Sequence, residues 1–140
     1  MNTENTSVAI KFRPVEPIWV KDPSKKKAIK ALVFNVEFNA EEYPETFHIP
    51  NIEIRQNIPV GMMVKIIVDW QKDYLMSERF WVEVTNITTD RNGERCYLGI
   101  AKNDTFVASY DSPIGPFYPR HICDLDVDTF LKKNNLKLAA

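Results

Sequence analysis

The chain is poor in the residues from which most recognisable active sites are built. It has two cysteines, two histidines and four glycines among its 140 residues. Cys96 and Cys123 stand far apart and form no CxxC pair, which indicates free buried thiols. Four glycines leave no glycine-rich loop to hold a phosphate, and no serine occupies a GxSxG turn.

The chain also lacks an excess of charge of either sign, and it has no long apolar run. The net charge of −1 gives no global field that would attract nucleic acid or an anionic membrane. No segment approaches the ~18 consecutive apolar residues of a membrane helix, and the polar residues 1–7 lack the apolar centre of a signal peptide. Together with the missing motifs, this leads us to expect a cytoplasmic protein without a membrane partner, metal or cofactor, for which nucleic acid is a disfavoured partner.

What the chain does contain is typical of one globular domain. Hydrophobic residues make up 44% of it and charged residues 26%. We expect a single domain over residues 1–140. Its parts are a disordered stretch at residues 1–10, an N-terminal strand with its connection at residues 28–59, a β core at residues 60–123 and a short helix at residues 124–134.

Alternation of apolar and polar residues predicts the strands of the core. Residues 64–70 and 80–84 each place a set of apolar side chains on one face. Asn92-Gly93 is a strong hairpin signal, because a tight turn needs positive backbone torsions. We expect Leu98, on the returning strand, to point into the core.

The segments on either side of this core have weaker signals. Residues 32–38 alternate cleanly and predict a strand that covers one face of the sheet. Residues 11–20 contain two prolines, which fits an edge strand or an extended arm. Residues 119–123 should form a short final strand. Helix caps are expected at Asn51, and at Asp126 or Asp128.

These elements favour a mainly β fold, or an α+β fold with a minor helix. Short antiparallel strands joined by hairpins are typical of a small curved antiparallel sheet or a partly open barrel. The N-terminal strand would pack on this sheet, and the short helix would follow it at the C-terminal end.

Few polar residues are candidates for catalysis, metal binding or nucleic-acid contact, and each has a simpler structural explanation. His121 is better explained as a hydrogen-bonded structural residue than as a metal ligand. An enzyme would have to combine His121 with Asp104 or Glu83, and because no spacing favours this we expect no enzyme. The basic run Lys25-Lys26-Lys27 fits a nucleic-acid contact or a solvated loop, and the near-zero net charge favours the loop.

Aromatic residues are the other lead. Trp81 is expected on the face opposite the core, across the sheet from Tyr97 or Gly99. Its indole would either be covered by another element, which we favour, or be exposed as an anchor for a partner.

Four segments follow one pattern, PVGMMVK at residues 59–65, SERFWVEV at 77–84, YLGIAKND at 97–104 and YPRHI at 118–122. This pattern resembles that of a family of small bacterial domains of uncharacterised function. The matching residues are Val60, Gly61, Val64, Lys65, Glu78, Arg79, Trp81, Val82, Val84, Tyr97, Gly99, Asn103, Asp104, Pro119, His121 and Ile122. The family usually has tyrosine-glycine-aspartate before its last strand, whereas this chain reads Tyr110-Asp111 without the glycine.

Members of that family resemble domains encoded beside bacterial toxins, for which a role as immunity protein has been suggested. The resemblance therefore implies a non-catalytic protein-binding domain, an immunity protein that neutralises a cognate toxin. Such an inhibitor needs shape, aromatic anchors and complementary charge. The candidate partner-binding residues are Trp81, Glu83, Tyr97, Asp104, Tyr110 and Asp111. The alternative is a regulatory or accessory module that binds a nucleic acid or a small ligand on the face of a β-barrel.

Overall fold

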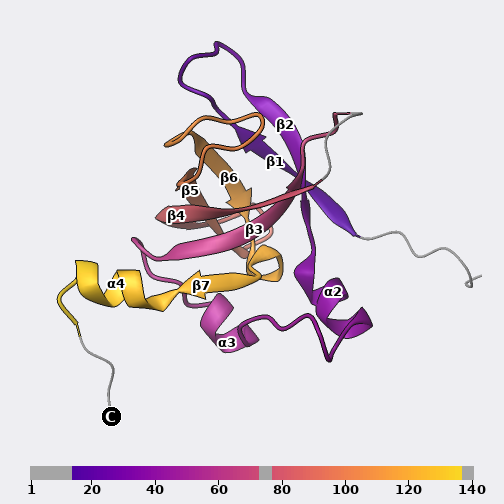
Figure 1. Cartoon of the computed structure of the whole chain (residues 1–140), viewed down its shortest axis with the longest axis vertical. Helices are drawn as coiled ribbons and strands as arrows, with labels where there is room; N and C mark the ends of the chain where they lie inside the picture. Colours follow the sequence, from indigo (N-terminus) through magenta and orange to yellow (C-terminus); the bar gives the residue numbers. More distant parts are fainter. Residues whose placement is uncertain (1–13, 73–76, 137–140) are drawn as a thin grey trace, which may run out of the picture.

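The computed structural model describes residues 14–72 and 77–136, so the stretch predicted to be disordered lies outside the described residues. Within them are seven β-strands, three α-helices and one 3₁₀-helix (Figure 1). The strands are β1 (Val15–Val20), β2 (Ile29–Phe34), β3 (Met63–Asp69), β4 (Glu78–Thr89), β5 (Arg95–Ala101), β6 (Pro113–Phe117) and β7 (Asp124–Asp126). The helices are α2 (Val36–Glu42), α3 (Ile52–Arg55), the 3₁₀-helix η1 (Pro119–His121) and α4 (Val127–Lys133).

Strands β1 to β6 form a closed antiparallel barrel. Each strand pairs with the next one along the chain, and β6 returns to pair with β1. Two junctions are short: Trp19 lies opposite Gly115 where β1 meets β6, and Val33 lies opposite Val68 where β2 meets β3. The mainly β fold predicted from the sequence is confirmed, and the structure shows that the barrel is closed.

The seventh strand extends the sheet outside the barrel. β7 pairs with the first half of β3, where Val64 lies opposite Leu125, while the second half of β3 pairs with β2. One edge of β3 therefore pairs with two strands, β7 and β2. Helix α4 follows β7 outside the barrel (Figure 1).

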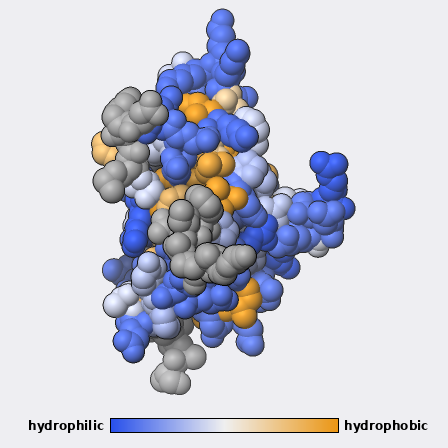
Figure 2. All heavy atoms as spheres, turned by 90° about the vertical axis from the view of Figure 1, so that its right-hand side faces the viewer, coloured by the Kyte–Doolittle hydropathy of each residue, from blue (hydrophilic) through white to orange (hydrophobic). Residues whose placement is uncertain are grey.

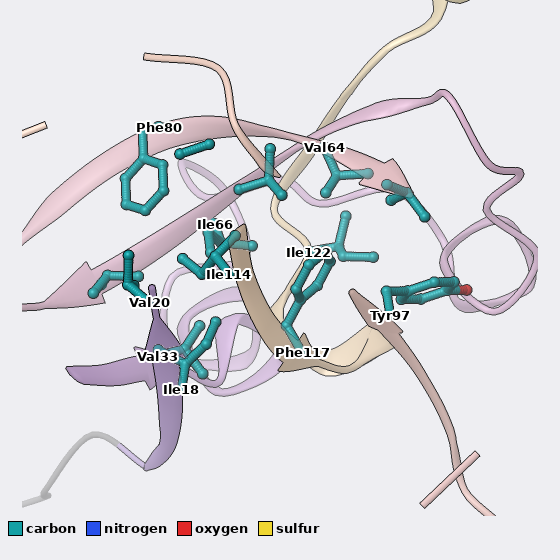
Figure 3. Packing of buried hydrophobic residues seen from close by; sticks show 14 of the residues in the cluster. Ile18, Val20, Val33, Val64, Ile66, Phe80, Tyr97, Ile114, Phe117 and Ile122 are labelled. Atoms are coloured by element: carbon teal, nitrogen blue, oxygen red, sulfur yellow. The ribbon is translucent and has the colours of Figure 1, made fainter. Parts of the chain in front are cut away.

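The barrel interior holds one hydrophobic core, to which all six strands contribute (Figure 3). The rings of Trp70 and Phe80 stack with their centroids 5.8 Å apart. Tyr97 lies against Phe117 at the same centroid distance. The inward faces predicted for the strands that became β3 and β4 are confirmed.

A smaller cluster lies on the outside of β3. Ile67 packs there with Phe34, Val36 and Cys123, and Phe47 is packed against them. The segment that follows β2 therefore covers part of the outer wall, which explains why β3 is apolar on both faces at this point.

The side chains of β5 point the opposite way from the prediction. Tyr97 lies in the core, and Leu98 is outside with 38% of its surface exposed. A bulge in β4 shifts its register with β5, and a shift of one residue exchanges the two faces of a strand. Gly99 fits against β4 only because it has no side chain, since a Cβ there would lie 2.4 Å from the carbonyl oxygen of Glu83.

The N-terminal strand is shorter than predicted. Residues 32–38 do not form one strand, because β2 ends at Phe34 and helix α2 follows. Asn35 ends the strand, since its side chain accepts a hydrogen bond from the backbone N–H of Glu37 at 3.0 Å and so caps the helix. Both β1 and β2 lie in the barrel wall.

The predicted helix caps are confirmed, and the predicted final strand is not. Asn51 caps α3 and Asp126 caps α4, as predicted. The final strand predicted at residues 119–123 is wrong: Pro119 begins the 3₁₀-helix, and the strand β7 begins at Asp124. Proline suits the first turn of a helix and has no N–H to donate to a sheet.

The surface is mostly hydrophilic on the face that lies on the right of Figure 1, and hydrophobic residues appear there as separate areas between polar ones (Figure 2). Single exposed apolar residues are normal on proteins, so only contiguous groups of them are informative. No helix in residues 14–72 and 77–136 is long and apolar enough to span a membrane.

The register of β5 can be tested with two aliphatic residues. Ile66→Ala should lower the free energy of unfolding by about 2–5 kcal/mol, because truncating a fully buried side chain leaves a cavity. Leu98→Ala should cost less than about 1 kcal/mol, because Leu98 lies on the outer surface. Urea denaturation measures both values, and equal losses would contradict the register described above.

Candidate functional site

Most of the residues predicted to bind a partner gather on the outer face of β4 and on the loop that follows β5, around Lys102. The Lys102 Nζ atom lies 2.8 Å from Asp111 Oδ1 and 3.8 Å from Glu83 Oε1. It also lies 5.0 Å from the centre of the Tyr110 ring. The hydrogen bond to Asp111 raises the pKa of Lys102. Sequence reasoning missed Lys102, although this residue joins the candidates to one another.

Two more candidates are attached to this group through backbone hydrogen bonds. The Tyr110 N–H donates to Asp104 Oδ1 at 3.0 Å. The Trp81 N–H donates to Asn103 Oδ1 at 2.7 Å. We call Trp81, Glu83, Lys102, Asp104, Tyr110 and Asp111 the Lys102 cluster.

Trp81 is half-buried, so its indole is neither fully covered nor free. Its neighbour on β3 is Lys65, whose Nζ lies 4.6 Å from the ring centre in a cation–π contact. On the other side, the Trp81 carbonyl accepts the N–H of Lys102. The predicted position across from Tyr97 or Gly99 is wrong, because those two residues pair with a later part of β4.

Tyr97, the remaining candidate, is not on this face. It is fully buried, and its hydroxyl donates to the Arg55 carbonyl at 2.7 Å and accepts the Ile58 N–H at 3.3 Å. Figure 3 shows this hydroxyl pointing away from the other core residues. Burial raises the pKa of Tyr97, which keeps the hydroxyl protonated. A buried Tyr97 offers no surface to a partner, and this corrects its prediction as a binding residue.

A shallow apolar groove lies beside the Lys102 cluster and was not predicted. It has a volume of about 370 Å³, and its lining includes Trp19, Thr85, Leu98, Ile100 and Pro113. Trp19 exposes 48% of its surface and Leu98 exposes 38%. We call this feature the Trp19 groove.

A glycine keeps this groove open. Gly115, on β6, lies opposite Trp19 of β1 and has a φ of +153°, a backbone conformation that favours glycine. A Cβ at this position would lie 2.7 Å from Leu98 Cδ2. A larger residue would therefore displace Leu98 and change the shape of the groove.

The groove and the cluster form one continuous face. Ile100, in the groove, lies opposite Glu83 of the cluster on β4 and opposite Pro113 on β6. The face therefore has an apolar part with an aromatic residue and, on one side of it, a rim of charged residues.

A second set of polar residues lies between β1 and η1. Arg120 donates to Glu16 from Nε to Oε1 at 2.8 Å and from Nη2 to Oε2 at 2.7 Å. Arg120 also pairs with Glu94, and its guanidinium lies 4.3 Å from the centre of the Tyr118 ring. His121, which is fully buried, lies with Nε2 2.8 Å from Glu16 Oε1.

The contacts of His121 determine where its proton lies. Its Nδ1 accepts the backbone N–H of Tyr118 at 3.0 Å, so the neutral ring carries its proton on Nε2 and donates it to Glu16. Burial lowers the pKa of His121. The hydrogen bond from His121, with those from Arg120, lowers the pKa of Glu16 to about 2. These contacts support the structural interpretation of His121.

The residues of the enzyme and metal alternatives are not brought together. Asp104 and Glu83 belong to the Lys102 cluster, whereas His121 contacts Glu16. Among the described residues, no three His, Cys, Asp or Glu side chains are grouped so that they could hold a metal ion. Burial raises the pKa of Cys123 to about 11, so its thiol is a poor nucleophile.

Acid should destabilise the protein in two ranges of pH. The free energy of unfolding should fall as the pH drops below about 6.5, because the unfolded chain then binds a proton at His121 that the folded chain does not. It should fall further between about pH 4.5 and about pH 2, because Glu16 is protonated in the unfolded chain first. Urea unfolding at a series of pH values measures both changes.

Two variants test whether Glu16 and His121 cause these two falls in the free energy of unfolding. Glu16→Gln should make the fall below pH 4.5 less steep and leave the fall below pH 6.5 in place. His48→Gln, which changes the other histidine of the chain, is the control. If His48→Gln removed the fall below pH 6.5, the assignment to His121 would be wrong.

Comparisons of the chain with protein-family models, curated proteins and solved structures found no match. Two features bear on function: the face formed by the Lys102 cluster and the Trp19 groove, and the resemblance of the four sequence segments.

Proposed function

We propose that the chain is a protein-binding domain without catalytic function, and that it binds its partner with the face formed by the Trp19 groove and the Lys102 cluster. The observation that carries this proposal is the exposed pair of Trp19 and Leu98 beside a rim of charged residues. Binding energy in protein interfaces is concentrated in a few large side chains, and polar residues around them exclude water. The face has this composition.

The arrangement of the face also supports binding. Its residues lie mainly on paired strands of a closed barrel, so they lose little further freedom when a partner binds. Lys102 is already held between Asp111 and Glu83, and a second contact joins Glu83 to Lys133 on α4 at 3.1 Å. A fixed pattern of charges favours specificity for a complementary partner.

We further propose that the partner is a bacterial toxin and that the chain acts as its immunity protein, by covering the active site of the toxin. The support is the resemblance of the four segments. Of the residues matched to that pattern, Trp81, Gly99, Asn103 and Asp104 lie in this face or beside it. Others, such as His121, are buried and maintain the fold. A family that shares both a fold and a binding face would have residues of both kinds.

Co-expression with the toxin encoded by the neighbouring gene tests the proposal. The chain should restore growth and form a stable complex with the toxin. Leu98→Glu and Trp19→Ala should each weaken the complex at least about thirtyfold, which corresponds to about 2 kcal/mol, because each removes an apolar contact at the centre of the face. Both variants should keep a melting temperature close to that of the unchanged chain, because both residues lie on the surface.

Ile54→Glu is the matched control, because Ile54 is 49% exposed on α3 and lies outside this face. It should bind as the unchanged chain does. Full protection by Leu98→Glu would show that the partner uses another surface. An unchanged chain that neither binds nor neutralises the toxin would contradict the immunity function.

A further inference from the structure

Three loops meet at one end of the barrel, away from the connections at the other end. They join β1 to β2, β3 to β4 and β5 to β6, and their described parts lie in the upper part of Figure 1. An up-and-down barrel brings alternate connections to the same end, because neighbouring strands run in opposite directions. Described residues of these loops line an open cavity of about 580 Å³, which is the size of a small-ligand site.

Lysines line this cavity. Lys25, Lys26 and Lys27 come from the first loop, Lys72 from the second and Phe106 from the third. No carboxylate is among the described residues that line it, and none of these lysines forms an ion pair with another described residue. Because the whole chain has a net charge of −1, this positive charge is a local concentration. We call the feature the lysine cavity.

A buried carboxylate holds two of these loops together. Asp22 accepts hydrogen bonds from the Ser24 N–H at 2.9 Å and from the Ser24 hydroxyl at 2.7 Å. It also accepts one from the Ser109 hydroxyl, on the third loop, at 3.3 Å. The Ser24 hydroxyl keeps the pKa of Asp22 below its usual value. The backbones that carry the lysine run and Phe106 are therefore held in a defined relation before any ligand binds.

Phe106 exposes 72% of its surface although its backbone is anchored. The Phe106 N–H donates to Glu78 Oε1 at 3.1 Å, and the same oxygen accepts the Trp70 indole N–H at 2.8 Å. In the next turn, Thr105 Oγ1 accepts the Ala108 N–H at 2.7 Å. A phenyl ring that is exposed beside cations, on an anchored backbone, is suited to stacking on a nucleobase.

We infer that the lysine cavity binds a ligand that carries both a phosphate and a nucleobase, which is either single-stranded nucleic acid or a free nucleotide. The lysines contact the phosphates and Phe106 stacks on the base. The sequence favoured a solvated loop for Lys25-Lys26-Lys27, and what the fold adds is the convergence of Lys72 and Phe106 on that run. The lysine cavity and the proposed protein-binding face have no lining residue in common among the described residues.

Fluorescence anisotropy of a labelled oligothymidylate of about ten nucleotides tests this inference with the full chain at low salt. The unchanged chain should bind it. A variant with Lys25, Lys26 and Lys27 all changed to Ala should bind at least about tenfold more weakly and should depend less on salt, because phosphate contacts are lost. Phe106→Ala should bind about tenfold more weakly, and Phe106→Tyr should bind like the unchanged chain because it keeps a flat ring.

Lys132→Ala is the control, because Lys132 is an exposed lysine on α4 outside the cavity. It should bind as the unchanged chain does. An equal loss of affinity in Lys132→Ala would overturn the inference, and so would undiminished binding by Phe106→Ala, which would indicate a general attraction for anions. The inference would also be overturned if the unchanged chain bound neither the oligonucleotide nor ATP.

Competition separates the two sources of the ligand. Displacement of the oligonucleotide by ATP, with ATP binding weakened by Phe106→Ala, would support a nucleotide site. Binding of the oligonucleotide that ATP does not displace would support a site for single-stranded nucleic acid. Neither measurement uses a protein partner, so their outcome is independent of the proposed immunity function.

Discussion

The barrel closes through two short strand junctions. β1 and β6 meet over a short junction in which Trp19 lies opposite Gly115, and β2 meets β3 over a junction of similar length. Once these junctions are made, the strands β1 to β6 share one core, and the sheet edges that would attract other chains are paired. Closure also gathers alternate loops at the same end of the barrel. Both proposed sites follow from this geometry, one on the outer wall and one at the rim.

A single strand shows how core and surface depend on each other. Tyr97 of β5 points inward, and its hydroxyl bonds the backbone at Arg55, the last residue of α3, and at Ile58, in the segment that follows α3. Leu98, the next residue, points outward into the Trp19 groove. The bulge in β4 sets which of the two is inside. The same local irregularity therefore secures the connecting segment and creates the apolar part of the proposed binding face.

Charged residues are used in two different ways in this fold. Arg120 is bonded to Glu16 and Glu94, and together with His121 it fastens β1 to η1. The side chains of Arg120 and Glu16 are 25% and 32% exposed, and partly exposed ion pairs add only modest net stability. The lysines at residues 25–27 form no ion pair with a described residue and project from a loop that Asp22 holds in place. Charges that pair within the fold maintain it, whereas the lysines at residues 25–27, which pair with no described residue, are the ones proposed to bind a ligand.

Elements with local signals could be predicted from the sequence. The alternation in β3 and β4, the hairpin at Asn92-Gly93 and the caps at Asn51 and Asp126 each depend on neighbouring residues, and the structure contains all of them. Trp19 carried a local signal as well, because it alternates with residues that are now known to be buried, but its two nearby prolines left an extended arm as an alternative.

Features that depend on distant residues could not be predicted in this way, because they arise from the folding of the whole chain. The direction of β5 follows from a bulge in its partner strand, and hydropathy alone favours placing Leu98 inside over a tyrosine and a glycine. The Lys102 cluster, the contact of His121 with Glu16 and the approach of Phe106 to the lysine run join segments that lie well apart along the chain. Such contacts exist because a closed barrel fixes which strands and loops are neighbours, and periodicity along one segment contains no information about them.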